Sequence, residues 1–167
     1  MKEYRVGMYG GKFLPFHKGH RFCVETAALE CEVVYVILFL GGVEEERIMT
    51  SQPKEYLSAR ERTKRMNLMC KEACKYAKVI PAIINIKGLR LPDGSEDWEA
   101  ETPLVRQIVG NKLDAVYSSE ESYTEYFSRA YPEAKHRLVD VQRIHFPISG
   151  TIIRKMKTDR ERSLWIV

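Results

Sequence analysis

The segment from Tyr4 to His20 reads YRVGMYGGKFLPFHKGH, and the order of its features predicts the start of an α/β fold. Tyr4 to Tyr9 is a short apolar and aromatic run, as expected for a strand, and Gly10-Gly11 ends it. A helix is expected to follow from His20 to Leu29. In a parallel sheet, the turn between such a strand and helix lies at the carboxyl edge, where ligands bind. This opening segment therefore predicts both a fold class and the place of a site.

Apolar runs and helix-periodic stretches continue to alternate along the chain. This pattern indicates one Rossmann-like α/β domain with a mainly parallel five-stranded sheet flanked by helices. The other four strands are expected at Glu32–Leu40, Lys78–Ile86, Asp114–Ser118 and Lys135–Val141. The other helices are expected at Ser58 to about Tyr76, Thr102–Val109, Glu121–Ala130 and from Thr151 onward. Polar loops are expected at residues 42–53 and 87–97, and no repeat or linker is visible.

The composition is that of an ordinary globular protein of 167 residues, with 44% hydrophobic and 30% charged residues. The net charge of +4 is too small to indicate nucleic-acid binding, although it suits a site for anionic substrates. The charged start, Met1 to Arg5, does not resemble a signal peptide, and the longest apolar run, Val33 to Leu40, is too short to span a membrane. We therefore expect a cytoplasmic protein without a membrane partner. Its four cysteines form no C-x-x-C pair, so we expect buried or half-buried thiols and no metal site.

The first candidate site lies between Gly10 and His20. Gly10-Gly11 permits the close backbone approach that a phosphate cradle requires, and Lys12 adds a mobile cation. His17 and His20 are three residues apart at a helix start, where both rings can donate to phosphate, and Gly19 leaves the space between them open. Histidines at a helix start can also be capping or packing groups. The preceding strand, double glycine and lysine favour a site.

The second candidate site lies between Ile148 and Arg154, which read ISGTIIR and open a helix. Ser149 or Thr151 can cap that helix. Thr151 and Arg154 are also three residues apart and share a helix face. A hydroxyl, free amides and a guanidinium on one side of a helix start form a second polyphosphate site. Two such segments facing one crevice are expected to hold a triphosphate between them.

Together, G-x-F-x-P-x-H-x-G-H from Gly11 to His20 and I-S-G-T-x-x-R from Ile148 to Arg154 resemble the nucleotidyltransferase superfamily. The second motif is most similar to the nicotinamide-nucleotide adenylyltransferase domain of NadR-type proteins. The resemblance implies a single nucleotidyltransferase, cytidylyltransferase-like domain over residues 1–167. It implies transfer of AMP from ATP to a phosphorylated acceptor with release of pyrophosphate, most simply to nicotinamide mononucleotide to give NAD. Mg²⁺ is expected to arrive with ATP.

The same resemblance implies roles for individual residues. His17 and His20 would contact the triphosphate, and Gly11, Lys12 and Phe13 would line the phosphate and acceptor side. Further groups are implied: Ser149, Thr151 and Arg154 for the leaving pyrophosphate, with Gly150 between them as a substrate-binding residue; Ser118, Ser119 and Glu120 near the adenine; and Trp98, after Asp93-Gly94, for stacking on a nicotinamide ring. Packing in the core or in a lid is the alternative role for Trp98.

Several departures and alternatives remain open. NadR-type proteins carry a kinase domain after this one and often a DNA-binding domain before it, and we do not expect kinase activity or repressor function from these 167 residues. The sequence also lacks the R-T-x-G-I-S-T-T form of cytidylyltransferases, which favours ATP over CTP. Phosphopantetheine or a phosphoalcohol is an alternative acceptor, and a non-catalytic nucleotide sensor is an alternative protein class. A class I aminoacyl-tRNA synthetase fragment fits less well, because Lys155-Met156-Lys157 is not a K-M-S-K-S loop. No nucleic-acid partner is expected, and a homo-oligomer is left open.

Overall fold

A computed structural model describes all residues from Met1 to Val167. Its five strands form one sheet with the order β3-β2-β1-β4-β5, and every neighbouring pair is parallel. The strands are β1 (Tyr4–Gly11), β2 (Cys31–Leu40), β3 (Lys78–Asn85), β4 (Ala115–Ser118) and β5 (Lys135–Leu138). The predicted fold class, a parallel five-stranded α/β sheet flanked by helices, is confirmed.

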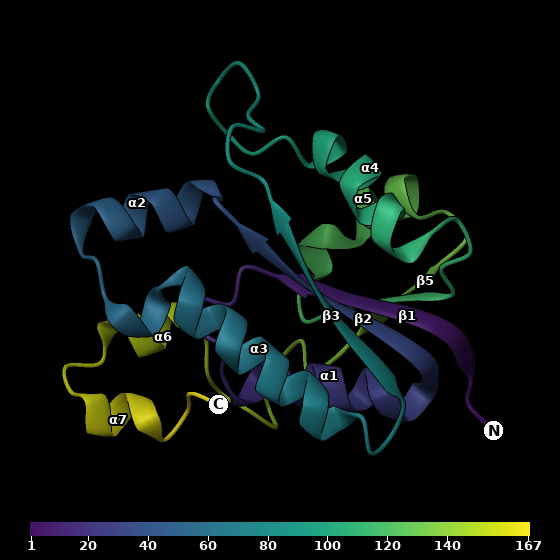
Figure 1. Ribbon diagram of the computed structural model, residues 1–167, viewed down its shortest axis with the longest axis horizontal. Coiled ribbons are helices and arrows are strands. Elements are labelled where there is room, and N and C mark those ends of the chain that lie inside the picture. The colour runs from purple at the N-terminus through teal and green to yellow at the C-terminus, as the bar shows by residue number, and fades with distance from the viewer.

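Helices cover both faces of this sheet (Figure 1). One face carries α1 (Lys18–Glu30) and α3 (Ala59–Ala73), and the other carries α4 (Trp98–Val109) and α5 (Thr124–Ala130). Beyond the ends to which the strands point lie α2 (Val43–Ser51), α6 (Gly150–Lys155) and α7 (Asp159–Ser163). Two short 3-10 turns, η1 (Glu55–Leu57) and η2 (Glu121–Tyr123), precede α3 and α5. No helix is both long and apolar enough to cross a bilayer.

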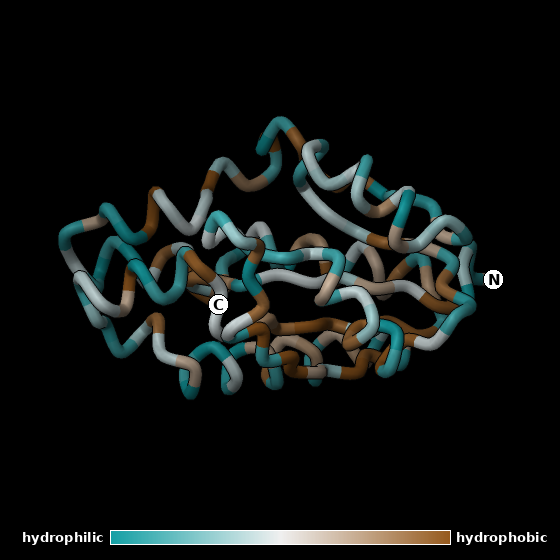
Figure 2. Tube along the Cα trace, turned by 90° about the horizontal axis from the view of Figure 1, so that it is seen from above, coloured by the Kyte–Doolittle hydropathy of each residue, from teal (hydrophilic) through white to brown (hydrophobic).

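The core explains why β2 is apolar along its whole length. Val36 and Leu38 pack into the cluster beneath α1 and α3, whereas Ile37 packs into the cluster beneath α4 and α5. A strand that is buried on both faces needs apolar residues at consecutive positions, and not only at alternate ones. Figure 2 shows the hydrophobic stretches of the chain gathered along the strands, with mainly hydrophilic outer helix turns. Of the four cysteines, three are buried, but Cys74 is exposed, contrary to expectation.

The prediction of a polar loop at residues 42–53 is wrong, because Val43 to Ser51 form helix α2. Ile48 is the only buried residue of this helix, so the sequence has no apolar periodicity that would predict the helix. Three consecutive glutamates in its first turn favour the helix dipole. Each also pairs with an arginine from a different part of the chain: Glu44 with Arg154, Glu45 with Arg62 and Glu46 with Arg90.

Other boundaries differ by a few residues. Helix α4 begins at Trp98 and not at Thr102, because the Asp97 carboxylate caps it by accepting from the Ala100 amide at 3.1 Å. Residue Pro103 is therefore inside the helix and does not mark its start. Helix α1 begins two residues early, at Lys18, and β5 ends at Leu138. The earlier start of α4 places Trp98 in its first turn, which matters for the site.

Arg62 ties three separate segments together from the interior. Its side chain is fully buried on α3, where it donates to the carbonyls of Leu57 at 2.9 Å and Lys12 at 3.0 Å. Its remaining nitrogen donates to the Glu45 carboxylate of α2. Burial lowers the pKa of the Arg62 guanidinium, and the Glu45 carboxylate opposes that effect. One guanidinium thus holds η1, the segment after β1, and the start of α2 in one arrangement.

Removing this guanidinium is expected to be costly. Arg62→Ala leaves the Glu45 carboxylate and two carbonyls without their partner, which should lower the free energy of unfolding by about 3–5 kcal/mol. Arg60→Ala on the same helix is the control, because Arg60 is exposed and its surface pair with Glu55 should contribute little to stability. Urea unfolding followed by circular dichroism measures both. Equal losses for the two variants would contradict the role given to Arg62.

Candidate active site

His17 and His20 cap helix α1 with each other's help. The Gly19 amide donates to His17 Nδ1 at 3.0 Å, and the His17 amide donates to His20 Nδ1 at 3.1 Å. This is the reciprocal arrangement of a capping box, with imidazoles in place of the usual hydroxyl and carboxylate. The two rings stack with centroids 3.6 Å apart. A side chain at Gly19 would meet the His17 ring at 2.9 Å, so this spacing requires glycine.

Capping also determines which ring nitrogen carries the proton. Each Nδ1 accepts from a backbone amide, so it must be unprotonated. Burial lowers the pKa of His17 to about 4, and burial together with the charges on His17 and Arg143 lowers the pKa of His20. Both rings are therefore neutral near pH 7 and hold their proton on Nε2, which makes no hydrogen bond within the chain. The capping role is correct, and it leaves two N–H donors free for a ligand.

An aromatic shelf supports the histidine pair. Phe13 stacks on Phe16 with centroids 3.9 Å apart, and its ring meets His20 edge-on at 4.8 Å. Phe13 has a left-handed φ of 51°, which places its ring beneath the histidines and not in a regular strand. The chain's end also contacts this segment, because the Lys18 amide donates to the Trp165 carbonyl at 2.9 Å. These contacts desolvate His20 and fix its orientation.

The second motif packs directly against the first. Arg154 Nη1 donates to the Leu14 carbonyl at 2.6 Å, across 140 residues of sequence. A Cβ on Gly150 would lie 2.7 Å from the same carbonyl, so the backbones meet at a distance that only glycine permits. Ser149 caps α6 by accepting from the Ile152 amide at 3.2 Å. The expected convergence of the two motifs at one place is therefore present.

Arg154 also contacts Thr151 and α2. Its Nη2 donates to Thr151 Oγ1 at 3.3 Å and to the Glu44 carboxylate at 2.7 Å. Arg154 and Thr151 line a cavity of about 310 Å³ between α2 and α6, together with the cationic residues Arg47, Lys54 and Lys155. No acidic side chain lines this cavity, which therefore suits an anion. The Glu44 carboxylate thus pairs with the arginine whose contact with the Leu14 carbonyl joins the two motifs.

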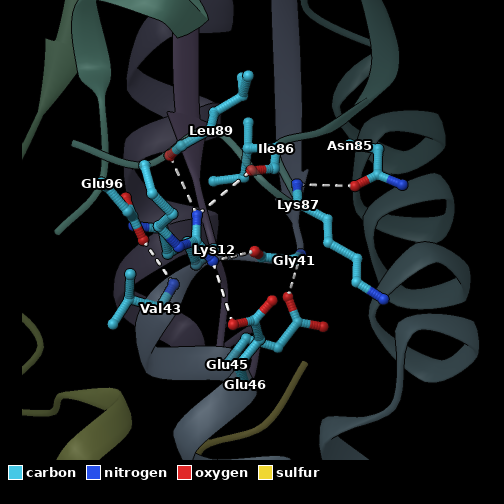
Figure 3. Close-up of polar contacts among 11 residues, drawn as sticks. Lys12, Gly41, Val43, Glu45, Glu46, Asn85, Ile86, Lys87, Leu89 and Glu96 are labelled. Atoms are coloured by element: carbon cyan, nitrogen blue, oxygen red, sulfur yellow. Dashed lines mark hydrogen bonds and ion pairs between the residues drawn. The ribbon is translucent and has the colours of Figure 1, made fainter. Parts of the chain in front are cut away.

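Two carboxylates accept hydrogen bonds from backbone amides near the start of α2 (Figure 3). The Gly41 amide donates to Glu45 at 2.6 Å, and the Val43 amide donates to Glu96 Oε1 at 2.9 Å. The other Glu96 oxygen accepts from Lys12 Nζ. Desolvation opposes these contacts, but they hold the pKa of Glu96 below its ordinary value. Lys12 is therefore held by an ion pair, and it is not the mobile cation that the sequence suggested.

A second cavity, of about 250 Å³, lies at the carboxyl end of β1, and we call it the inner cavity. It is lined by Met8, Gly10, Gly11, Lys12, Phe39, Glu44, Glu96, Trp98, Glu101, Val105, Ser118, Tyr123, Tyr126, Phe127 and Tyr131. Trp98 is half-buried in this wall, and its ring packs edge-on against Tyr123 at 5.2 Å and Tyr126 at 5.3 Å. The predicted residues Gly10, Gly11 and Lys12 thus share a cavity with Trp98. His17 and His20 do not line it.

The Ser118-Ser119-Glu120 segment follows β4 and reaches both sides of the site. Ser118 lines the inner cavity, whereas Ser119 Oγ lies 3.2 Å from Cys23 Sγ of α1. Glu120 pairs with Arg143 at 3.1 Å, and Arg143 Nη1 donates to the Ile148 carbonyl at 2.8 Å. Arg143 was not among the predicted site residues. Its left-handed φ of 52° and its charge beside the histidines could not be inferred from sequence.

Glu101 is the other residue that sequence reasoning missed. Its side chain lines the inner cavity from α4 and is only 8% exposed, and its Oε1 is buried without a hydrogen-bond partner. Burial raises its pKa to about 7, and the Glu96 carboxylate adds to the effect. The predicted start of α4, Thr102, left Glu101 outside the helix, so nothing in the sequence placed Glu101 on a buried helix face.

The raised pKa of Glu101 predicts a pH-dependent cost to stability. In the unfolded chain the carboxyl ionises near its ordinary value of 4.5, but in the folded protein it holds its proton up to about pH 7. Folding is therefore increasingly disfavoured as pH rises from 4.5 to 7. Glu101→Gln should increase the free energy of unfolding by about 2–3 kcal/mol more at pH 8 than at pH 5.

Urea unfolding at the two pH values measures this difference. Glu99→Gln is the matched control, because Glu99 is on the same helix but exposed, where it pairs with Arg129 at 2.9 Å. The control should show almost no difference between the two pH values. A Glu101→Gln effect that is the same at pH 5 and pH 8 would mean that the carboxylate is not strained by its burial.

Comparisons with known proteins give structural matches only. No family model matches the sequence, and no curated protein is significantly similar to it. Among solved structures, a NadR protein in complex with NAD and AMP-PNP has a TM-score of 0.66 and 19% identity, covering 99% of this chain and 46% of that chain. A NadR protein in complex with NR has a TM-score of 0.67 and 18% identity, covering 99% and 43%.

A third solved structure, from Francisella tularensis, is a bifunctional NMN adenylyltransferase/ADP ribose pyrophosphatase complexed with AMP and a manganese ion. It has a TM-score of 0.51 and 20% identity, covering 82% of this chain and 37% of that chain. This chain therefore spans less than half the length of each of the three. At such identities the likeness shows the fold. The resemblance indicated by the two motifs is matched at that level: this chain has the α/β fold of NadR proteins and of an NMN adenylyltransferase.

Proposed function

We propose that this chain is a nucleotidyltransferase that moves AMP from Mg²⁺–ATP to a phosphorylated acceptor and releases pyrophosphate. The observation that carries the proposal is the contact between Arg154 and the Leu14 carbonyl, because it joins the two phosphate-binding motifs. All 167 residues are assigned to one nucleotidyltransferase domain. The proposed acceptor is nicotinamide mononucleotide, which would give NAD. The fold shared with proteins solved with NAD, AMP-PNP and AMP supports this choice.

The protonation of the histidines determines the kind of catalysis we propose. With Nδ1 occupied by a backbone amide and the proton on Nε2, neither ring can accept a proton from the acceptor. Both can donate to phosphate oxygens as negative charge develops on them. A phosphate monoester is already a nucleophile near neutral pH, so the reaction needs no general base. The chain's contribution is then position and charge stabilisation for an in-line attack on the α-phosphorus.

Arg154 and its neighbours are assigned to the β- and γ-phosphates. A guanidinium that donates to a carbonyl with Nη1 keeps one edge for a phosphate oxygen. That edge is occupied by the Glu44 carboxylate at 2.7 Å, so a triphosphate must displace Glu44. The cavity lined by Arg47, Lys54 and Lys155 lies beside this pair and would receive the leaving pyrophosphate. Lys12 and the glycines before it would face the acceptor's phosphate from the inner cavity.

The role of His20 is tested by a variant that keeps the cap. His20→Asn retains an acceptor near Nδ1 for the His17 amide but removes the Nε2–H donor. We expect kcat for pyrophosphate release to fall by roughly 10²–10³-fold, with a nearly unchanged Tm. His136→Gln is the control, because His136 lies on the edge strand β5 and contacts Thr124. An unchanged kcat for His20→Asn would reject the role.

Glu44 and ATP are expected to compete for Arg154, so substitutions of Arg154 and of Glu44 should change the affinity for ATP in opposite directions. Arg154→Ala should weaken ATP binding by roughly tenfold or more, because it removes a charge-assisted contact. Glu44→Gln should tighten ATP binding a few-fold, because Arg154 is then released from its carboxylate. Calorimetric titration with Mg²⁺–ATP measures both, and Lys71→Ala is a control for loss of general positive charge, because Lys71 is exposed on α3 and lines neither cavity. Weaker binding to Glu44→Gln would show that Glu44 supports the nucleotide.

The acceptor is tested by direct product analysis. The protein is incubated with ATP, Mg²⁺ and nicotinamide mononucleotide, and NAD is sought by mass spectrometry. Phosphopantetheine, and CTP with a phosphoalcohol, are the comparison substrates. Formation of NAD with none of the other products is the expected result. Binding of ATP without turnover of any acceptor would instead indicate a nucleotide sensor.

A further inference from the structure

The inner cavity combines aromatic walls with an excess of negative charge. Its charged lining consists of three carboxylates, Glu44, Glu96 and Glu101, and a single cation, Lys12. Lys12 is already paired with Glu96, and Glu44 is paired with Arg154. The one carboxylate that no cation of the chain contacts is therefore Glu101.

Glu101 is an unusual group to leave without a partner. It is more than nine-tenths buried, and its Oε1 receives no hydrogen bond from the chain. A buried charge without a partner is costly, and such a group is normally paired or coordinated. Because Glu101 lines the inner cavity, a molecule bound in that cavity would supply the missing partner. A suitable molecule supplies a positive charge or an N–H donor.

The aromatic wall restricts the shape of that molecule. Trp98, Tyr123 and Tyr126 form one cluster by edge-on packing, and all three line the cavity. The Tyr126 hydroxyl is oriented by its bond to the Trp98 carbonyl at 2.9 Å, so the cluster is held in place. Aromatic faces attract flat cations, and a nearby carboxylate strengthens that attraction. A flat cationic ring therefore satisfies both the wall and Glu101.

We propose that Glu101 is a specificity-determining residue, which selects an acceptor whose ring is cationic and carries a neutral hydrogen-bond donor. An acceptor whose ring carries a carboxylate would be excluded, because its negative charge would face Glu101 and Glu96 without a free cation. This inference deepens the proposed function and rests on it for the identity of the acceptor. It selects pyridinium carboxamides over the corresponding pyridinium carboxylates.

A binding experiment without ATP tests the inference separately from catalysis. The probes are 1-methylnicotinamide and its carboxylate counterpart, 1-methylnicotinate, which lack ribose and phosphate. Dissociation constants are measured at pH 8, above the raised pKa of about 7 of Glu101, by ligand-observed NMR titration for the wild type, Glu101→Gln and Glu99→Gln. Gln is close to Glu in shape, and it relieves the buried charge, so the variant is expected to fold. Glu99 is on the same helix but exposed, so its variant controls for loss of charge alone.

The expected result is a preference for the carboxamide of at least about tenfold in the wild type and in Glu99→Gln. In Glu101→Gln the two probes should bind within a few-fold of each other. Equal binding of both probes to the wild type, an unchanged preference in Glu101→Gln, or no binding of either probe would overturn the inference. Pyrophosphate release with ATP and nicotinamide mononucleotide is measured in parallel. Its failure alone would overturn the proposed function and would leave the measured probe preference unchanged.

Discussion

The reciprocal cap between His17 and His20 is the constraint on which the site depends. Two backbone amides at the start of α1 need acceptors, and the two Nδ1 atoms supply them. The same bonds fix the direction of both rings and leave the proton on each Nε2. A requirement of helix formation thereby produces a pair of neutral donors at the carboxyl end of β1. The aromatic shelf of Phe13 and Phe16 keeps them in a dry environment, where their donation to a charged ligand is strongest.

Around this histidine pair, three arginines hold together segments that are far apart in the sequence. Arg62 joins the segment after β1 to α2 and α3, and Arg154 joins the same segment to α6. Arg143 joins the end of β4 to the second motif. Each guanidinium donates to a backbone carbonyl as well as to a carboxylate, which a lysine could not do with the same geometry. The site is thus built by planar cations that bridge loops, and its polar groups are positioned before a substrate binds.

Charge divides the crevice into two halves with opposite preferences. The cavity beside α6 is cationic and suits phosphates, whereas the inner cavity is acidic and aromatic. Glu44 of helix α2 connects the two cavities. Its side chain lines the inner cavity, and its carboxylate accepts a hydrogen bond from Arg154, which lines the cationic cavity. This division is what the proposed transfer between a polyphosphate and a ring-bearing acceptor would require. The burial of Glu101 has a cost in stability at neutral pH, as binding sites often do.

The sequence by itself determined the five strands, the parallel α/β class and the meeting of Gly10–His20 with Ile148–Arg154. Apolar runs and glycine turns are local signals, and parallel strands bring their carboxyl ends to one edge. Only the tertiary structure decided that residues 43–51 are helical, since their glutamates are satisfied by arginines up to 110 residues away. It also decided the roles of Glu101 and Arg143. The state of a buried charge depends on which groups surround it in space, and no spacing along the chain encodes that.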